Sequence, residues 1–214
     1  VTVIRDGEYI ETRDISGWDN DSLITAMVGR SLDNQFPKEI GVKSAEPMLK
    51  VEHLKETGVL NDVSFEAYSG QILGFAGLVG AGRTETMRAI FGADPIDGGT
   101  ITIKGKQVHI KTPRQAIQHG IAFLTEDRKG QGLAQSIRTN LILANMKGFS
   151  SGLFLNEKRI EDAGQKNIAS LRIKTPSIDE IVGQLSGGNQ QKVVIGKWVN
   201  TDADIFIFDE PTRG

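Results

Sequence analysis

The spacing of apolar and polar residues predicts an alternation of short strands and helices over most of the chain. Short apolar runs between turn residues predict strands, and apolar positions three or four residues apart predict helices. The predicted strands cover 48–51, 63–65, 71–76, 101–103, 108–110, 121–124 and 205–208, and the predicted helices cover 84–91, 187–199 and much of 130–182. Such alternation is typical of an α/β fold with a mainly parallel sheet. An antiparallel β portion is expected before this core, and a helical insertion within it.

The N-terminal residues form a separate pattern. Residues 1–10 predict a β-hairpin with its turn at Asp6-Gly7, followed by a short helix that Asp21 or a neighbour caps and Gly29 ends. Residues 33–47 lose this periodicity and have the composition of a linker. We therefore predict that 1–32 are the tail of a preceding domain, 33–47 a linker and 48–214 a second domain. The alternative is that 1–32 form the first hairpin of this same domain.

Composition narrows the function classes. The 214 residues include 25 Lys and Arg against 27 Asp and Glu, so no strong positive field is available to hold a nucleic-acid backbone. There is no cysteine, which excludes disulfides and thiolate metal sites. No apolar run approaches the roughly 20 residues that a membrane-spanning helix needs. Any link to a membrane is therefore expected to run through a partner protein.

A glycine-rich loop between a predicted strand and a predicted helix is the first candidate site. In Gly77-Leu-Val-Gly-Ala-Gly-Arg-Thr84, glycines allow backbone N–H groups to turn toward phosphate oxygens, and the helix adds its positive end. The predicted nucleotide-binding residues here are Gly77, Gly80, Ala81, Gly82, Arg83, Thr84 and Glu85. Thr84 is also predicted to offer its hydroxyl to Mg²⁺. The alternative is a glycine-rich turn that only joins a strand to a helix.

Arg83 departs from the usual phosphate-loop pattern, which has lysine at this position. A planar guanidinium does not replace the compact ammonium that reaches between the β- and γ-phosphates. Nucleotide binding is therefore expected to survive while turnover suffers.

Two acidic residues, Asp209 and Glu210, follow the strongly apolar segment 205–208. A strand here would present both carboxylates at the carboxyl edge of a sheet, where α/β folds bind ligands. Asp209 is predicted to hold the Mg²⁺ shell through water, and Glu210 to be the catalytic residue that positions or deprotonates an attacking water. The alternative is an acidic turn that caps a core strand.

A third motif opens the helix predicted over 187–199. Ser186, Gly187 and Gly188 stand at its N-terminus, where a hydroxyl and backbone amides bind an anion at the positive end of the helix dipole. Gln190, in the same motif, is included among the predicted nucleotide-binding residues. The alternative is a capped helix with flexible glycines, which the continuation Asn189-Gln-Gln-Lys-Val193 opposes.

The three motifs, 77–84, 185–193 and 209–214, resemble those of ATP-binding-cassette (ABC) nucleotide-binding domains, in the order that this family uses. Glu126-Asp-Arg-Lys129, with Leu133 following, resembles the second cassette of tandem subunits for bacterial uptake of simple sugars such as ribose and galactose. The resemblance covers about Met48 to Gly214, and 1–32 resemble the end of a first cassette. It implies an α/β P-loop NTPase core with an antiparallel β subdomain and a helical subdomain at about 130–182, incomplete after the strand that precedes Asp209.

The resemblance also implies an activity, cofactors and partners. ATP hydrolysis would be coupled to transport, with ATP and Mg²⁺ bound. Glu126 occupies the position at which most cassettes have a glutamine that senses Mg²⁺ and the γ-phosphate, so it joins the predicted cofactor and metal sites. The implied partners are the N-terminal cassette of the same polypeptide, membrane permease subunits and, indirectly, a periplasmic or extracellular sugar-binding protein, with no nucleic acid. The implied location is peripheral, on the cytoplasmic face of the cell membrane.

Departures from the family pattern leave other functions open. Arg83 replaces the loop lysine, Glu126 replaces the glutamine, and no aromatic residue stands between Val51 and Val63 to stack on adenine. The sequence also ends before the dimer-contact loop and switch histidine of a complete cassette. The alternatives are a non-hydrolysing regulatory cassette, the equivalent subunit of a nucleoside importer, and an ABC ATPase of DNA repair or translation.

Several apolar residues of the predicted helical region have two open roles: Leu141, Ile142, Leu143, Met146, Leu153 and Phe154. In the family this region contacts the permease, so some of them are candidates for that contact. Packing inside the helical subdomain is the other role.

Overall fold

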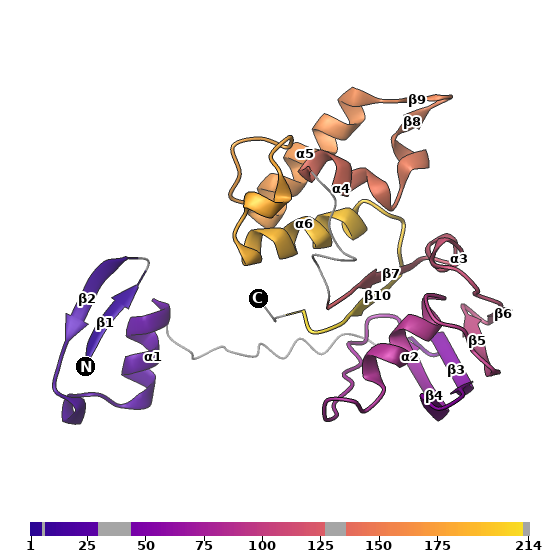
Figure 1. Cartoon of the computed structure of the whole chain (residues 1–214), viewed down its shortest axis with the longest axis horizontal. Helices are drawn as coiled ribbons and strands as arrows, with labels where there is room; N and C mark the ends of the chain where they lie inside the picture. The colour runs from indigo at the N-terminus through magenta and orange to yellow at the C-terminus, as the bar shows by residue number, and fades with distance from the viewer. Residues whose placement is uncertain (6, 30–43, 127–135, 212–214) are drawn as a thin grey trace. The chain divides into compact units, whose positions relative to one another are not determined.

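The computed structural model describes residues 1–5, 7–29, 44–126 and 136–211 (Figure 1). The chain forms two compact units, Val1–Val42 and Lys43–Gly214. The predicted turn residue Asp6, most of the predicted linker, and the segment 127–129 with Leu133 lie outside the described residues.

The first unit combines a two-stranded antiparallel sheet with one α-helix. Its elements are β1 (Thr2–Arg5), β2 (Glu8–Thr12), the 3-10 helix η1 (Ile15–Gly17) and α1 (Asn20–Val28). The Asp19 carboxylate caps α1 by accepting a hydrogen bond from the Ser22 backbone N–H at 2.7 Å. Gly29 ends the helix. The predicted hairpin and helix are confirmed, with Asp19 rather than its neighbour Asp21 as the cap.

A four-stranded antiparallel sheet forms one layer of the second unit (Figure 1). Its strands, in spatial order, are β4 (Leu60–Tyr68), β3 (Pro47–Glu56), β5 (Gly98–Ile103) and β6 (Lys106–Val108). Alternate apolar residues of β3 and β5 are buried, namely Leu49, Val51, Ile101 and Ile103. The predicted hairpin is confirmed, although its second strand is Lys106–Val108 and not 108–110.

The predicted parallel pairing is present between β7 (Ile121–Leu124) and β10 (Ile205–Phe208), whose bounds match the prediction. Three helices of the described residues contribute to the surrounding core: α2 (Arg83–Ile90), α3 (Pro113–Gln118) and α6 (Gly187–Val199). The Phe91 ring lies 5.4 Å from that of Phe123 and 5.9 Å from that of Trp198, centroid to centroid. These contacts join the end of α2 to β7 and α6, and so hold the loop before α2 near the parallel strands.

The strand predicted at 71–76 is not formed. The segment runs without strand pairing, and Ile72 is fully exposed. Residues 71–75 line a cavity that β10 also lines, so they are separated from the strand edge with which they would pair. Among the described strands, parallel pairing is limited to β7 with β10, and the larger sheet is antiparallel. The expectation of a mainly parallel sheet is therefore wrong for the described residues.

A mainly helical region follows β7, as predicted, and packs beside α6 (Figure 1). It contains α4 (Ile137–Leu143), η3 (Met146–Phe149), a short hairpin of β8 (Ser150–Ser151) and β9 (Phe154–Leu155), α5 (Glu157–Leu171) and η4 (Val182–Gln184). Leu141 and Ile142 are buried in its core. Four of the apolar residues singled out in the sequence remain exposed: Leu143, Met146, Leu153 and Phe154.

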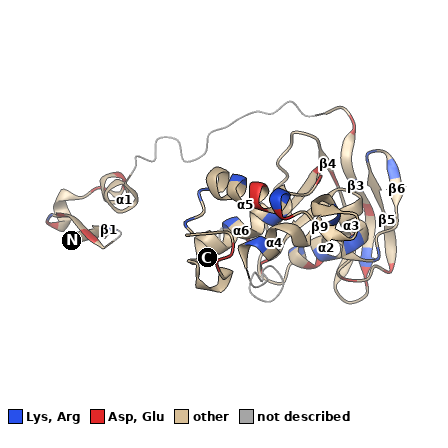
Figure 2. Ribbon diagram, turned by 90° about the horizontal axis from the view of Figure 1, so that it is seen from above, with Lys and Arg blue, Asp and Glu red and all other residues tan. Residues whose placement is uncertain are grey.

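The surface of the second unit carries both signs of charge. In the view of Figure 2, basic and acidic residues are interspersed rather than gathered by sign. Within the described ranges, no helix combines the length and the apolar character that crossing a bilayer requires.

One arginine joins three parts of the helical region. The Arg138 guanidinium on α4 lies 2.5 Å from Asp179 Oδ1, 3.1 Å from Glu157 Oε2 and 2.9 Å from Glu161 Oε2. The hydrogen bond from Arg138 lowers the pKa of Asp179 below its ordinary value. Arg138 therefore ties α4 to α5 and to the segment that leads into η4.

Low pH is expected to weaken the Arg138 ion pairs by protonating Asp179. A carboxyl group with a lowered folded-state pKa contributes stability above its unfolded pKa, about 3.9 for aspartate, and loses it as the pH falls through the lower folded value. The Arg138→Met variant should therefore be less stable than wild type at about pH 7, and the difference should shrink at about pH 2. Urea unfolding followed by circular dichroism measures both differences.

The exposed Arg159 on α5 supplies the control, because the structure shows no ion pair for it among the described residues. The stability difference of Arg159→Met should not change with pH. A pH-independent difference for Arg138→Met would contradict the assignment.

Candidate functional site

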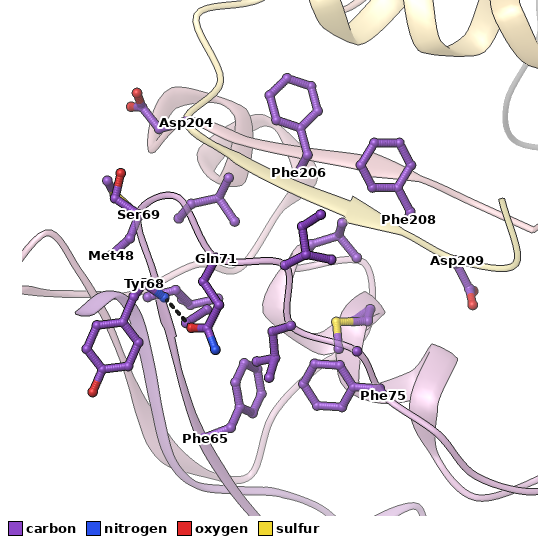
Figure 3. Close-up of a pocket in the computed structure, with 18 of the residues that line it drawn as sticks. Met48, Phe65, Tyr68, Ser69, Gln71, Phe75, Asp204, Phe206, Phe208 and Asp209 are labelled. Carbon is purple, nitrogen blue, oxygen red and sulfur yellow. Dashed lines mark hydrogen bonds between the residues drawn. The ribbon is translucent and has the colours of Figure 1, made fainter. Parts of the chain in front are cut away.

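The site lies at the edge where β7 and β10 end. Phe208 pairs with Leu124 in parallel register, and the Asp209 backbone N–H donates to the Leu124 carbonyl at 2.9 Å. The residues after each strand therefore emerge side by side, with Glu126 following β7 and Glu210 following β10. Figure 3 shows the Asp209 side chain just beyond Phe208 at this edge. The structure thus brings together the predicted site residues of both strands.

Asp209 has a buried oxygen without a partner. Its Oδ2 atom is buried and forms no hydrogen bond with any described residue. An unsatisfied buried carboxylate oxygen is costly unless a donor or cation reaches it. No group of three or more His, Asp or Glu side chains suited to a metal occurs in the described part of the chain. The arrangement suits Mg²⁺, which proteins usually hold by one or two carboxylates together with water and substrate phosphates.

The glycine-rich loop has the backbone shape that a phosphate loop needs. Gly80 and Gly82 have φ values of 82° and 80°, in the left-handed region that side chains disfavour. The turn of residues 78–81, which contains Gly80, is closed by a hydrogen bond from the Ala81 N–H to the Leu78 carbonyl at 3.1 Å. A Cβ on Gly82 would lie 3.3 Å from Leu60 Cδ2, so this glycine also allows the loop to approach β4 closely.

The loop ends at the N-terminus of α2. Gly82 is the N-cap residue and provides no side-chain hydrogen bond to the first turn. The Thr86 hydroxyl donates to the Gly82 carbonyl at 2.6 Å, which fixes the start of the helix. Thr84 and Glu85 lie in the first turn and are partly exposed. A helix start without a side-chain cap leaves backbone N–H groups for an anion.

Arg83 makes a contact that the sequence did not predict. Its Nη2 atom lies 3.4 Å from Glu210 Oε1, so the guanidinium at the start of α2 pairs with the acid after β10. Glu210 itself has a φ of 45°, in the left-handed region that is uncommon for a residue with a side chain. The predicted catalytic residue therefore forms an ion pair with the residue at the lysine position of the loop.

A pocket of about 590 Å³ opens between this site and the segment 71–75 (Figure 3). Arg83, Asp209 and Glu210 contribute its charged groups near the strand edge, and aromatic residues such as Phe65 and Phe206 line other parts. This volume is within the usual range for small-ligand pockets, about 300–1,000 Å³.

The motif at the start of α6 is placed elsewhere. Ser186, Gly187 and Gly188 are exposed, and none of them lines the pocket that contains Arg83, Asp209 and Glu210. Asn189 Nδ2 donates to Ser186 Oγ at 3.0 Å, and Asn189 Oδ1 accepts from the Lys174 N–H at 2.9 Å. These bonds orient the motif on the helical region without bringing it to the phosphate loop.

Gln190 makes a structural contact within the same motif. Its side chain is buried, and its Nε2 atom donates to the Leu185 carbonyl at 2.9 Å. The amide therefore holds the turn before α6, and its contact with a nucleotide stays a prediction. The next residue was not predicted: Gln191 Nε2 donates to the Pro211 carbonyl at 2.5 Å and links α6 to the segment after Glu210. Its position within the same motif was the only signal for it.

Comparisons with known proteins identify sequences and structures that resemble this chain. The family model described as ABC transporter matches residues 60–213. The chain is 48% identical to a ribose/galactose/methyl galactoside import ATP-binding protein of Agrobacterium fabrum and 50% identical to one of Burkholderia cenocepacia. Both matches cover 100% of this chain but 43% and 42% of the respective relatives. The chain thus spans less than half the length of these curated relatives.

Solved structures share the fold. MJ1267, an ATP-binding cassette of an ABC transporter, matches with a TM-score of 0.65 and 22% identity, over 79% of this chain and 71% of that chain. The cassette MJ0796, in a dimeric post-hydrolysis state bound to ADP and Pi, matches with a TM-score of 0.62 and 19% identity, over 77% and 75%. At these identities the likeness supports the cassette fold and nothing narrower.

Proposed function

The chain belongs to the ABC transporter family, and on this premise we propose that it is a nucleotide-binding cassette of a simple-sugar importer, in which ATP binding and hydrolysis drive transport. The similarity to ribose/galactose/methyl galactoside import ATP-binding proteins supports simple sugars as the transported class. The observation that carries the proposal is the buried, unpartnered Asp209 Oδ2 at the strand edge that also presents Glu210 to the loop residue Arg83.

The described residues fit ATP with Mg²⁺. The backbone N–H groups of the loop and of the start of α2 would bind the phosphates, and Thr84, Asp209 and Glu126 would hold the metal. When bound, Mg²⁺ neutralises charge on the phosphate oxygens. Glu210 would accept a proton from a water or orient it, provided that its carboxylate is free of Arg83.

The partners follow from the exposed motif on α6. Because Ser186, Gly187 and Gly188 lie outside the pocket, we infer that they cover a nucleotide held by another cassette, the N-terminal one of the same polypeptide. Residues 1–32 would be the tail of that first cassette, 33–47 a linker and 48–214 the second cassette. A two-stranded sheet with one helix is marginal by itself, which supports its belonging to a larger domain.

The exposed apolar residues of the helical region support a membrane partner. Leu153 and Phe154, at the β8–β9 hairpin, are 98% and 78% exposed, and Leu143 and Met146 are about half exposed. We infer that some of these four residues contact permease subunits, which would place the chain at the cytoplasmic face of the membrane and link it indirectly to a sugar-binding protein.

Equilibrium binding tests the proposal directly. The chain should bind ATP in the presence of Mg²⁺ and bind it more weakly when EDTA replaces the metal, because Asp209 requires a cation to hold the phosphates. Isothermal titration calorimetry measures both affinities, and phosphate release is assayed in the same samples. Ribose and a DNA oligonucleotide are the control ligands. Absence of ATP binding, or salt-dependent binding of DNA, would contradict the proposal.

The Arg83–Glu210 pair favours a second candidate, a regulatory cassette that binds ATP without hydrolysing it. The Arg83→Lys, Glu126→Gln double variant of the full-length subunit separates the two. A rise in phosphate release from this site would support the second candidate, because it would identify the wild-type site as the non-hydrolysing one. Unchanged or lower release would favour the first.

A further inference from the structure

Arg83 and Glu210 come from different elements and meet across the site. Arg83 is the first residue of α2, and Glu210 follows β10. Their side chains approach to 3.4 Å between Nη2 and Oε1, with 33% and 39% of their surfaces exposed. Within the described residues, neither side chain forms another ion pair. Among the described residues, one ion pair thus joins the phosphate loop to the predicted catalytic acid.

The geometry of this contact makes it easy to displace. It is a single, long and partly exposed pair, and such pairs contribute little in water. A guanidinium offers the same planar donors to carboxylates and to phosphates. A triphosphate arriving at the start of α2 carries several negative charges and would compete with a single carboxylate for these donors.

The backbone of Glu210 adds a second reason for displacement. Its φ of 45° lies in a region that costs energy for a residue with a side chain. Such a conformation persists only where the surroundings hold it, and both the Gln191 hydrogen bond to the Pro211 carbonyl and the contact with Arg83 act on this segment. Loss of the pair would remove one of these two restraints on Glu210.

We propose that Arg83 is a positioning residue that holds Glu210 in the nucleotide-free site and releases it when phosphates bind the guanidinium. This inference rests on the proposed ATP site at the same loop. It gives the arginine at the lysine position a role of its own, because the long planar group reaches from α2 to the end of β10. Glu210 would become available to a water only in the loaded site.

A double-mutant cycle on the full 214-residue chain tests the competition. Affinity for Mg·ATP is measured for wild type, Glu210→Gln, Arg83→Met and the double variant. With Arg83 present, Glu210→Gln should tighten Mg·ATP binding about threefold. With methionine at position 83, the same substitution should change the binding free energy by less than about half as much. Asp202→Asn is the matched control, because it removes one carboxylate charge from an exposed residue outside the pocket and its effect should be equal in both backgrounds. Equal effects of Glu210→Gln in both backgrounds would overturn the proposal.

A second measurement does not depend on nucleotide. In the nucleotide-free chain labelled with ¹³C-carboxyl glutamate, the Glu210 signal is identified by its loss in Glu210→Gln. Arg83→Met should shift this signal, Arg83→Lys should restore part of the shift, and saturating ATP should move the wild-type signal toward its position in Arg83→Met. If the position of the Glu210 signal is unchanged in Arg83→Met, the proposal is overturned, whatever the result with ATP. If no variant binds ATP although the signal responds to Arg83→Met, the proposed function fails and release by phosphates fails with it, while the ion pair itself is established.

Discussion

Replacing Asp209 with asparagine is expected to remove the magnesium dependence of ATP binding. The Oδ2 atom of Asp209 is buried and has no partner among the described residues, so the carboxylate is in place for a cation. Asparagine keeps the size of the side chain but loses the charge that Mg²⁺ requires. Affinity for Mg·ATP should fall by about 10- to 100-fold, while the weaker affinity measured with EDTA should change little. Calorimetric titration with and without Mg²⁺ measures both values.

Asp202 provides a matched control for this substitution. It is an exposed aspartate shortly before the same strand, and it does not line the pocket. Asp202→Asn makes the same chemical change and should leave the magnesium dependence as in wild type. A magnesium response retained by Asp209→Asn would show that the cation is held elsewhere.

Replacing Gly82 with valine is expected to disable the phosphate loop. Gly82 has a φ of 80°, and a Cβ there would lie 3.3 Å from Leu60 Cδ2. A branched side chain at this position would be strained at the positive φ and would also press against β4. Any backbone shift that relieves the strain or the close contact would move the first N–H groups of α2. The strain alone costs about 1–3 kcal/mol, so if the loop shifts to relieve it, affinity for Mg·ATP should fall at least about fivefold.

Two other glycines separate the causes. Gly80 shares the left-handed conformation but has open space around it, so Gly80→Ala tests strain without the contact. Gly183 has ordinary backbone angles and open space, so Gly183→Val should bind Mg·ATP as wild type does. A melting curve for each variant checks that the fold is intact. If Gly82→Val binds as tightly as wild type, the loop is only a connection between elements.

Much of the site was predictable because it is encoded in short segments. Apolar runs predicted β7 and β10 to the residue, and the helix predicted at 187–199 matches α6. The positive φ values of Gly80 and Gly82 follow from the glycine spacing of the loop. Each of these features depends on neighbours in the sequence, so local pattern is sufficient to predict it.

Other features depended on partners that are distant in the sequence. The segment 71–76 has an apolar, strand-like pattern, yet it forms no strand, because pairing requires another strand edge at hydrogen-bond distance. Gln190 is buried, and its amide donates to the Leu185 carbonyl, a contact that the motif alone did not predict. A motif indicates which residue types are present, and it does not state which side of a helix is covered.

The sequence by itself determined the order of the motifs, the family to which the chain belongs and the chemical types of the site residues. Tertiary structure alone decided that Arg83 meets Glu210, that Asp209 Oδ2 is buried without a partner, and that the motif at Ser186 lies outside the pocket. The physical reason is the range of the interactions. Backbone conformation and periodicity are set within a few residues, whereas ion pairs, burial and pocket walls arise only when packing brings separate elements together.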